Sequence, residues 1–437
     1  MDSEKWGIIG GGIMGMTLSH RLSQKGKNVT LFEAASELGG LASSWKMDDV
    51  EWDKFYHVIL LSDFRTRNIL KEIGLEDELN WVETKTGFYI NRKLYSMSDT
   101  IEFLKFPTLN LINKFRLGLT IIVASRIKNW KRLEKIPVTT WLNRWSGKNT
   151  FNKIWLPLLR AKLGESYKKT SAVFIWATIQ RLYGARRSGL KKEMFGYVSG
   201  GYKKIIKSFK ETLIAQNVVI KTNHSAKEVK KLSTGKIEIT FKSGFTEQFD
   251  KVIVTLPAGI SAQLCQGLTQ AEIQKLNGIE YLGVVCVSVL LNKPISKFYI
   301  TNITDSWVPF TGVIEMSALV DKKYFNGNSL IYLPKYLTSD DKIYDQSDEE
   351  IKETFIEIFK KMYPWIQQED IKFVGVARAR NVITVAKLNY SENLPEIKTS
   401  IPNLFIVNTS HIKDGTLNVN ETVRVAETKL EEILEKS

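Results

Sequence analysis

The feature that most constrains this chain is a glycine-rich turn near its N-terminus, between an expected strand and an expected helix. An apolar stretch over Lys5–Gly10 runs into Gly10–Gly15 (GGGIMG), and helical spacing follows over Ile13–Gln24. In a G-x-G-x-x-G turn the first glycine permits a tight bend, and the second lets backbone N–H groups approach a pyrophosphate. The third lets the helix pack closely on the strand, and the helix N-terminus favours an anion. The sequence therefore predicts a dinucleotide site.

A second expected strand, Asn28–Glu33, ends on a carboxylate 18 residues after Gly15. An acidic side chain at this place accepts hydrogen bonds from an adenosine ribose. Glycine clusters also form ordinary turns, so the prediction depends on strand, turn, helix, second strand and Glu33 being in register. A strand–helix–strand start requires a parallel sheet with helices on its faces. We therefore expect an α/β fold with a Rossmann-like domain.

Six residues after Glu33 the chain continues with Gly39–Ala42 (GGLA). With the glycine turn and the acidic strand end, this stretch resembles the signature of the amine oxidase, protoporphyrinogen oxidase and phytoene desaturase superfamily of flavoproteins. It is most similar to the bacterial NAD(P)/FAD-dependent oxidoreductases of that superfamily. The resemblance implies FAD as the cofactor, bound by Gly10, Gly11, Gly12, Ile13, Met14, Gly15, Glu33, Ala34, Gly39, Gly40, Leu41 and Ala42.

Two stretches in the middle of the chain extend the resemblance. Gly200–Tyr202, before an expected helix over Lys203–Leu213, resembles the family's glycine-led helix. Val218–Val229 resembles the strand that passes the adenine, which assigns Ala226 to the cofactor site.

The C-terminal stretch Asn403–Glu427 resembles the family's second flavin motif, in which a strand and a helix N-terminus reach the cofactor. The resemblance assigns Asn408 and Val419 to this site. Asn408 stands where the family usually has Asp, and Gly415 is the one glycine of the following turn.

The pattern of expected elements predicts two interleaved domains. Residues 1–90, 200–262 and 396–437 would form the FAD-binding domain. Residues 91–199, which are helical and basic over about Thr100–Leu190, and residues 263–395 would form a substrate domain of mixed sheet and helices. The later expected strands are Lys236–Phe241, Lys251–Leu256, Gly283–Leu291, Ser329–Leu333 and Asn403–Val407, and the later expected helices are Asp348–Met362 and Asn420–Leu434.

His57 is the candidate catalytic residue and a candidate flavin contact. It ends Trp52–His57 (WDKFYH), and a similar stretch in UDP-galactopyranose mutases, relatives of this fold, puts a histidine beside the flavin. A histidine there could hydrogen-bond the ring or handle a proton near neutral pH. It could equally be a partly buried histidine bonded to the backbone.

Basic and aromatic residues near one expected helix could bind an anionic head group of the substrate. The alternative is an ordinary basic helix that packs its aromatic residues inward. The candidate substrate residues are Arg160, Lys162, Tyr167 and, further along the chain, Arg378. We expect no metal, because metal-ligand spacing is missing around His20, His224 and His411.

The chain has 62 basic and 47 acidic residues, a formal net charge of +15. This balance favours an anionic partner, although ordinary solvated lysine faces would also produce it. Because zinc-finger, RNP-like and arginine-rich motifs are missing, we expect no nucleic acid partner. A basic segment around Leu117–Ala124 favours either an anionic membrane surface or a domain helix with a solvated basic face. Its basic residues are Lys114, Arg116, Arg126, Lys128, Lys131, Arg132 and Lys135.

The N-terminus runs directly into a strand without a signal-peptide pattern, and no apolar run reaches the length of a membrane span. Cys265 and Cys286 form neither a disulfide framework nor a CxxC motif. We therefore expect a cytoplasmic protein, with peripheral association at the inner face of the membrane as an open alternative.

Together these observations predict an FAD-dependent oxidoreductase that transfers a hydride between the flavin and a carbon of an apolar or amphipathic substrate, a small molecule or a lipid-like one. A second G-x-G-x-x-G is missing, so the electrons would pass to oxygen, a quinone or a transiently bound carrier. Two alternatives remain open. One is a non-redox flavoenzyme resembling UDP-galactopyranose mutase, acting on a sugar nucleotide, and the other is a non-enzymatic escort-like protein of the same fold.

Overall fold

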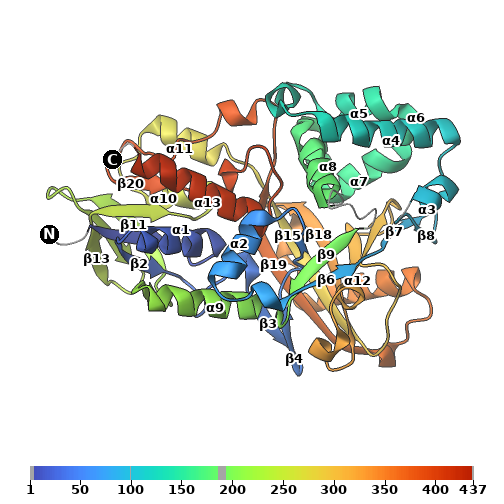
Figure 1. Ribbon diagram of the computed structural model, residues 1–437, viewed down its shortest axis with the longest axis horizontal. Helices are drawn as coiled ribbons and strands as arrows, with labels where there is room; N and C mark the ends of the chain where they lie inside the picture. The colour runs from blue at the N-terminus through green and yellow to red at the C-terminus, as the bar shows by residue number, and fades with distance from the viewer. Residues whose placement is uncertain (1–3, 99, 186–192, 436–437) are drawn as a thin grey trace.

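The computed structural model describes residues 4–98, 100–185 and 193–435. A small parallel sheet with its helices lies beside a larger mixed sheet, and a group of helices covers one end of the larger sheet (Figure 1). The expected α/β class is confirmed. The helical stretch expected over Thr100–Leu190 is present as far as Ala185, and residues 186–190 lie outside the described residues.

The parallel sheet has five strands in the order β10-β2-β1-β14-β20. Each strand continues into a loop at the same edge, because all neighbouring pairs are parallel. Strands buried on both faces read as nearly continuous apolar runs, which is why the sequence pattern found them. Their bounds are Lys5–Ile9 for β1, Asn28–Phe32 for β2, Val219–Lys221 for β10, Lys251–Val254 for β14 and Leu404–Ile406 for β20.

Side chains on the two faces of β1 pack into two different hydrophobic cores. Trp6 and Ile8 pack with the helices on one face, whereas Ile9 packs with a three-stranded antiparallel sheet on the other. The first face holds α1 (Ile13–Gln24), α2 (Phe64–Glu72), α9 (Gly201–Ala215) and α13 (Val419–Leu434). The second holds β11 (Ala226–Lys231), β12 (Ile237–Phe241), β13 (Thr246–Phe249), α10 (Ala258–Leu264) and α11 (Gln270–Asn277).

The larger sheet has seven strands in the order β19-β15-β18-β17-β16-β7-β8. Strand β15, which lies between β19 and β18, is buried along its whole length. Helix α12 (Asp348–Met362) packs on one face, and the opposite face meets the hairpin of β3 and β4. The bounds are Thr86–Ile90 for β7, Lys93–Ser96 for β8, Tyr281–Leu291 for β15, Ile300–Ile303 for β16, Gly312–Glu315 for β17, Ser329–Thr338 for β18 and Ile371–Thr384 for β19.

Two smaller groups of strands join the sheets. The hairpin consists of β3 (Ser44–Met47) and β4 (Val50–Asp53), and β9 (Met194–Val198) lies between β5 (Ile59–Leu60) and β6 (Leu79–Glu83).

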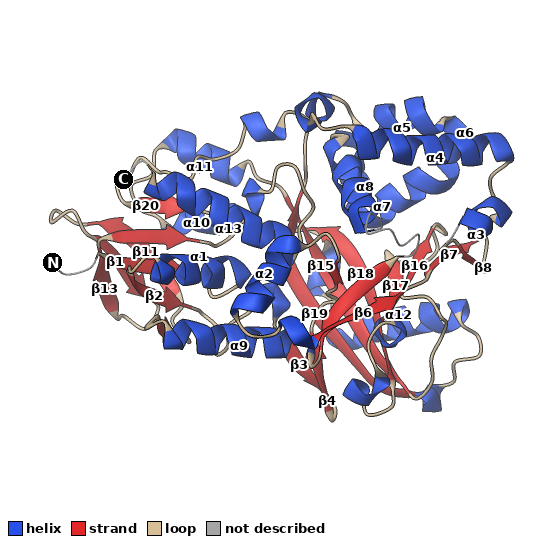
Figure 2. Cartoon of the chain, in the orientation of Figure 1, coloured by secondary structure: helices blue, strands red, loops and turns tan. Residues whose placement is uncertain are grey.

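The group of helices gathers at one end of the larger sheet (Figure 2). It is formed by α3 (Thr100–Lys105), α4 (Leu111–Arg126), α5 (Val138–Ser146), α6 (Lys148–Thr150), a π-helical turn (Phe151–Trp155), α7 (Leu156–Leu163) and α8 (Val173–Ala185).

Two expectations about strands need correction. The strand expected to end at Leu333 continues through Pro334 to Thr338, because its pairing with β17 stops at Tyr332 and the proline interrupts no hydrogen bond on that side. Strand β19 was not expected, since its polar residues hide the pattern of a strand. Strand β7 lies within residues 1–90, which were expected in the FAD-binding domain, but it pairs with β16 in the larger sheet. The division of the chain into five domain segments stays a proposal.

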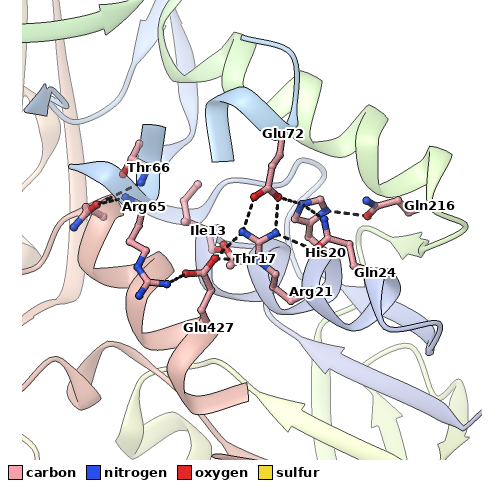
Figure 3. A network of polar contacts seen from close by, with 11 residues as sticks. Ile13, Thr17, His20, Arg21, Gln24, Arg65, Thr66, Glu72, Gln216 and Glu427 are labelled. Carbon is pink, nitrogen blue, oxygen red and sulfur yellow. Dashed lines mark hydrogen bonds and ion pairs between the residues drawn. The ribbon is translucent and has the colours of Figure 1, made fainter. Parts of the chain in front are cut away.

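A polar network joins the helices that cover the parallel sheet (Figure 3). Arg21 on α1 donates to Glu72 on α2 at 2.5 Å and to Glu427 on α13 at 2.6 Å. The buried His20 contacts Glu72 at 2.6 Å and Gln216, which ends α9, at 2.9 Å. One turn of α1 is therefore tied to three other helices, which fixes where the N-terminus of α1 points.

We predict that Arg21→Met lowers the free energy of unfolding by about 1–2 kcal/mol at pH 7, because two half-buried carboxylates lose their shared cation. Burial raises the pKa of Glu72, but the hydrogen bonds from Arg21 and His20 bring it below its ordinary value. The ionised Glu72 therefore stabilises the folded protein above the pKa that this side chain has in the unfolded chain, and this stabilisation is lost as the pH falls. The difference in free energy of unfolding between Arg21→Met and the wild type should shrink below about pH 4.

Denaturant titration at pH 7 and pH 3 measures both effects. Lys361→Met is the matched control, because Lys361 pairs with Glu357 on the exposed side of α12 and should cost under about 0.5 kcal/mol. An Arg21 variant as stable as this control would mean that the network does not hold α1.

Candidate functional site

The carboxyl edge of the parallel sheet collects the residues that the sequence assigned to the cofactor. β1 leads to Gly10, β2 to Glu33, β14 to Thr255 and β20 to Val407 and Asn408. The strand order reverses between β1 and β14, because the chain goes outward from β1 through β2 on one side and through β14 to β20 on the other. In open parallel sheets, ligands bind in the crevice at such a point.

The three key glycines of the first turn have three different surroundings. Gly10 has φ of +110°, which favours glycine, and a methyl group at Gly15 would lie 1.9 Å from the carbonyl oxygen of Gly10. These two residues let α1 start directly against β1. Gly12 differs: its φ is −75°, and a methyl group there would have nothing within 4 Å. Space is therefore kept open beside the N-terminus of α1, where a pyrophosphate fits.

The second glycine pair folds over this turn. The N–H of Gly39 donates to the carbonyl of Gly11 at 2.9 Å, and Gly39 and Gly40 have φ of +120° and +56°. A methyl group at Gly40 would lie 3.4 Å from Cα of Gly12. The short helix of Gly40, Leu41 and Ala42 therefore sits next to the open space at Gly12, and the two halves of the expected FAD motif meet.

Glu33, the expected ribose contact, is fixed in place by hydrogen bonds from backbone N–H groups. Its carboxylate accepts from the N–H of Gly11 at 2.7 Å and from the N–H of Ala35 at 2.8 Å. Two oxygens have about four acceptor positions, so capacity remains for ribose hydroxyls. Residues 33–35 lie beside residues 221–224, since His224 N–H donates to the carbonyl of Glu33 at 2.8 Å. This pairing brings Ala34 towards the start of β11, where Ala226 lies.

The flavin end of the crevice is expected at the N-terminus of α9, where Asp53 and His57 lie together. Asp53 is 1% exposed, and its carboxylate accepts from the N–H of Tyr202 at 2.9 Å. Burial raises the pKa of Asp53 to about 8 and lowers that of His57 to about 4, so both are neutral at pH 7. His57 Nδ1 lies 3.8 Å from Asp53 Oδ2, which is too far for a direct hydrogen bond.

A cavity of about 10 Å³, the room of roughly one water molecule, touches Asp53, His57 and Tyr202. His57 also packs its ring 4.7 Å from the ring of Tyr202. Its catalytic role stays a prediction. A neutral imidazole in this place can exchange hydrogen bonds, but it cannot serve as a resident cation.

The two C-terminal candidates lie at the same edge. Asn408 is 1% exposed, and its amide donates to the carbonyl of Leu256 at 2.8 Å and accepts from the N–H of Ser410 at 3.0 Å. It therefore ties the end of β20 to the end of β14, and a cofactor contact by its side chain stays a prediction. Val419 is the first residue of α13, whose N-terminus is capped by the side chain of Asn418.

The residues proposed for the substrate do not converge. Lys162 lies over the ring of Tyr336 at 3.4 Å, whereas Arg160 is exposed beside Tyr167. Arg378 lies on the other face of the larger sheet, because its neighbour across the strands is Val285 and that of Tyr336 is Val284. Arg378 pairs there with Asp348 and donates to the carbonyl of Gln346.

Sequence reasoning missed three residues of the site. Asp53 carries no local signal beyond its place in the stretch that ends at His57, because its burial depends on the packing of α9 against β4. Thr255 donates to the carbonyl of Ile9 at 2.9 Å and supports the glycine turn. Asn418 had a signal, the Asn-x-x-Glu spacing of a helix start, which the sequence contains at Asn418 and Glu421.

Within the described ranges, no three His, Cys, Asp or Glu side chains lie close enough to hold a metal ion. Among the helices described, none combines the length and the apolar character that crossing a membrane requires.

We predict that Gly12→Val folds normally but retains no FAD, because its side chain would fill space that the protein leaves open. Glu33→Ala should keep the fold and weaken FAD binding by about 1–3 kcal/mol, since carboxylate acceptors are lost. Gly15→Ala should instead destabilise the protein itself, because its methyl group meets the backbone carbonyl of Gly10. Flavin absorbance per protein and thermal unfolding separate the three results. Normal FAD content in Gly12→Val would show that this turn is not the phosphate site.

A family model described as "Flavin containing amine oxidoreductase" matches residues 13–383. Zeta-carotene desaturase of Synechocystis sp. is 24% identical over 258 residues, 53% of this chain and 52% of that protein, so the chain spans about half the length of this relative. An oxidoreductase from Methanosarcina mazei has a similar fold, with a TM-score of 0.75 at 16% identity over 98% of this chain and 100% of that one. A reduced UDP-galactopyranose mutase has a TM-score of 0.75 at 15% identity over 100% and 96% of the two chains. The chain belongs to the flavin containing amine oxidoreductase family, a family of FAD-dependent oxidoreductases.

Proposed function

We propose that the protein is an FAD-dependent oxidoreductase that moves a hydride between the flavin and a carbon of an apolar or amphipathic substrate. The observation that carries the proposal is the aromatic face of the larger sheet next to the flavin end of the crevice. Tyr332 of β18 donates to the backbone carbonyl of Asp53 at 2.6 Å, so the sheet is joined to the loop before His57. Tyr56 and Tyr336 continue this face towards α7.

Four titratable side chains along this face are neutral at pH 7: Tyr56, Cys286, Asp53 and His57. Burial raises the pKa of Tyr56 to about 12 and that of Cys286 well above its ordinary value. Asp53 keeps its proton, and His57 lacks one. Such a surface orients a substrate through apolar contact and neutral hydrogen bonds.

Bound FAD would supply the hydride acceptor or donor, which the side chains of this chain cannot do themselves. The work of the protein is then to hold the dinucleotide through the glycine turn and Glu33, to exclude water with Tyr56, Tyr332 and Tyr336, and to keep His57 and Asp53 uncharged beside the ring.

We predict that an apolar or amphipathic substrate bleaches the flavin absorbance when oxygen is excluded, and that air restores the colour. A substrate panel followed at the flavin absorbance maximum in an anaerobic cuvette measures this. His57→Gln keeps a hydrogen-bonding side chain and should reduce the rate of bleaching but not the FAD content.

Turnover of a sugar nucleotide by the reduced protein without any electron acceptor would replace the proposal with the mutase alternative. A purified protein without flavin would favour the escort-like alternative.

We also propose that the protein works at an anionic membrane surface, where an amphipathic substrate would be found. The helices beside the larger sheet expose an apolar face: Leu111 is 72% exposed, Ile112 71% and Phe115 72%. Residues 101–164, which contain this face, have thirteen basic and two acidic residues. An apolar face in a segment with so large an excess of positive charge suits the boundary between lipid headgroups and acyl chains.

The basic segment expected from the sequence needs one correction here. Lys114 is 7% exposed and donates to the carbonyl of Leu104, and Arg116 donates to the backbone of Arg144 and Trp145. These two cations hold the helices together: Lys114 is buried and Arg116 is half-buried. Arg126, Lys128, Lys131, Arg132 and Lys135 are exposed and supply the positive surface.

We predict that the protein sediments with anionic vesicles at low salt and binds neutral vesicles poorly. Ile112→Glu with Phe115→Glu should abolish binding at physiological salt, and Lys128→Glu, Lys131→Glu and Arg132→Glu together should weaken it mainly at low salt. Ile214→Glu is the matched control, because Ile214 is 55% exposed on α9, in the FAD-binding half of the protein. Flavin content should be unchanged in all of them. If the wild type ignores anionic vesicles at low salt, the membrane proposal fails.

A further inference from the structure

Lys162 is directed into the protein by the helix that carries it. Leu159 and Leu163 on the same helix, α7, are 2% and 1% exposed and pack into the core of the helical layer, whereas Arg160 points to solvent. Lys162 occupies the third side, towards the larger sheet. Thr311 fixes this approach, because its hydroxyl donates to the carbonyl of Ala161 at 2.7 Å.

Within the described part of the chain, the ammonium of Lys162 has no hydrogen-bond acceptor and no carboxylate partner. Its contact is the ring of Tyr336, 3.4 Å from Nζ to the ring centre. The other inward-facing lysine of the helical layer, Lys114, donates to a backbone carbonyl. Lys162 is half-buried, and an ammonium that lies on an aromatic ring without an anionic partner is available to a ligand that comes and goes. Part of the Lys162 side chain remains accessible, which allows a small molecule to reach it.

A pair of tyrosines completes a set of donors around this ammonium. The hydroxyls of Tyr56 and Tyr336 are 2.9 Å apart. One hydroxyl hydrogen joins the two oxygens, and the other is left to donate elsewhere. Burial raises the pKa of both phenols, Tyr56 to about 12, so they stay protonated. Lys162 and the free hydroxyl together offer two donors, which matches the two oxygens of a carboxylate.

We propose that Lys162, with the tyrosine pair Tyr56 and Tyr336, binds the carboxylate of the substrate, while the apolar body of the substrate lies along the aromatic face of the larger sheet. This inference rests on the proposed function, since it places the substrate between α7 and the flavin end of the crevice. The site takes a carboxylic acid with an apolar body. Lys162 binds and orients, and it takes no part in the transfer of the hydride.

The proposal also fixes how binding depends on pH. Burial lowers the pKa of Lys162 to about 7, so the cation is lost as the pH rises through that value. A carboxylate ligand should therefore bind best below pH 7 and progressively less above it. On the sheet and on the loop before His57, burial raises the pKa of Tyr336, Cys286 and Tyr56, so these groups stay uncharged at neutral pH. On α7 and its following turn, the charged side chains of Arg160 and Glu165 are exposed to solvent.

The test titrates the FAD-loaded protein with benzoate and with benzamide, its neutral counterpart, and follows the visible spectrum of the flavin. We expect saturable binding of benzoate, weaker binding of benzamide, and an affinity for benzoate that falls from pH 6 to pH 8.5. Lys162→Met should weaken benzoate binding about tenfold to a hundredfold and remove its pH dependence over this range, without changing benzamide binding. Lys162→Arg should retain part of the affinity and none of this pH dependence, because arginine stays charged.

Arg160→Met is the matched control, since it removes an exposed cation two residues away on the same helix. Equal benzoate binding by Lys162→Met and wild type, equal losses in both variants, or no benzoate binding at millimolar concentration would each overturn the carboxylate site. Binding of inorganic phosphate in place of benzoate, lost in Lys162→Met, would overturn it in favour of a phosphate site. The FAD content of each variant and the anaerobic bleaching assay report on the proposed function separately, so either proposal can fail alone.

Discussion

The close approach of α1 to β1 is the constraint on which the rest of the structure depends. A side chain at position 15 would collide with the carbonyl of Gly10, and only its absence lets the helix start directly at the strand. The N-terminus of α1 then points into the crevice where the strand order reverses. The network of His20 and Arg21 holds the helix in that direction, because it joins α1 to three other helices (Figure 3).

The two sheets have separate tasks that meet at the loop from Asp53 to His57. The parallel sheet provides the glycine turn, Glu33 and the helix N-termini that suit a dinucleotide. One face of the larger sheet packs against α12. The other face, which carries Tyr332 and Tyr336, lies towards this loop. Under the proposed function, reactive chemistry and substrate recognition belong to different layers, and the chain crosses between these layers several times.

Local patterns were sufficient to predict the glycine turn with the strands and the helix next to it, whereas the strand expected over Val218–Val229 is divided into β10 and β11. The turn at Gly10–Gly15 and the bounds of α1 follow from short-range spacing, and the structure has the expected helix over Ile13–Gln24. The family resemblance assigned Gly39 and Gly11 to the same cofactor site, and in the structure a hydrogen bond joins them. Contacts of this kind are encoded within about thirty residues of sequence.

The substrate half could not be predicted in the same way, because its geometry depends on partners far apart in the chain. Arg378 and Lys162 looked equivalent as sequence, yet the pairing register of β15 with β18 and β19 puts Arg378 on the opposite face of the sheet from Tyr336. Lys114 looked like a surface cation, but it turns inward to the carbonyl of Leu104. The burial of Asp53, which keeps its carboxyl group neutral, depends on α9 and β18, two elements far from it in the sequence.

A crystal structure of the protein purified with its cofactor tests the central claim most directly. The account predicts the pyrophosphate of FAD against the backbone N–H groups at the N-terminus of α1, the adenosine ribose at Glu33, and the flavin ring beside the loop of Asp53 and His57, facing Tyr56 and Tyr336. A cofactor whose pyrophosphate lies away from Gly12, or whose flavin ring faces away from the aromatic side of the larger sheet, would contradict it.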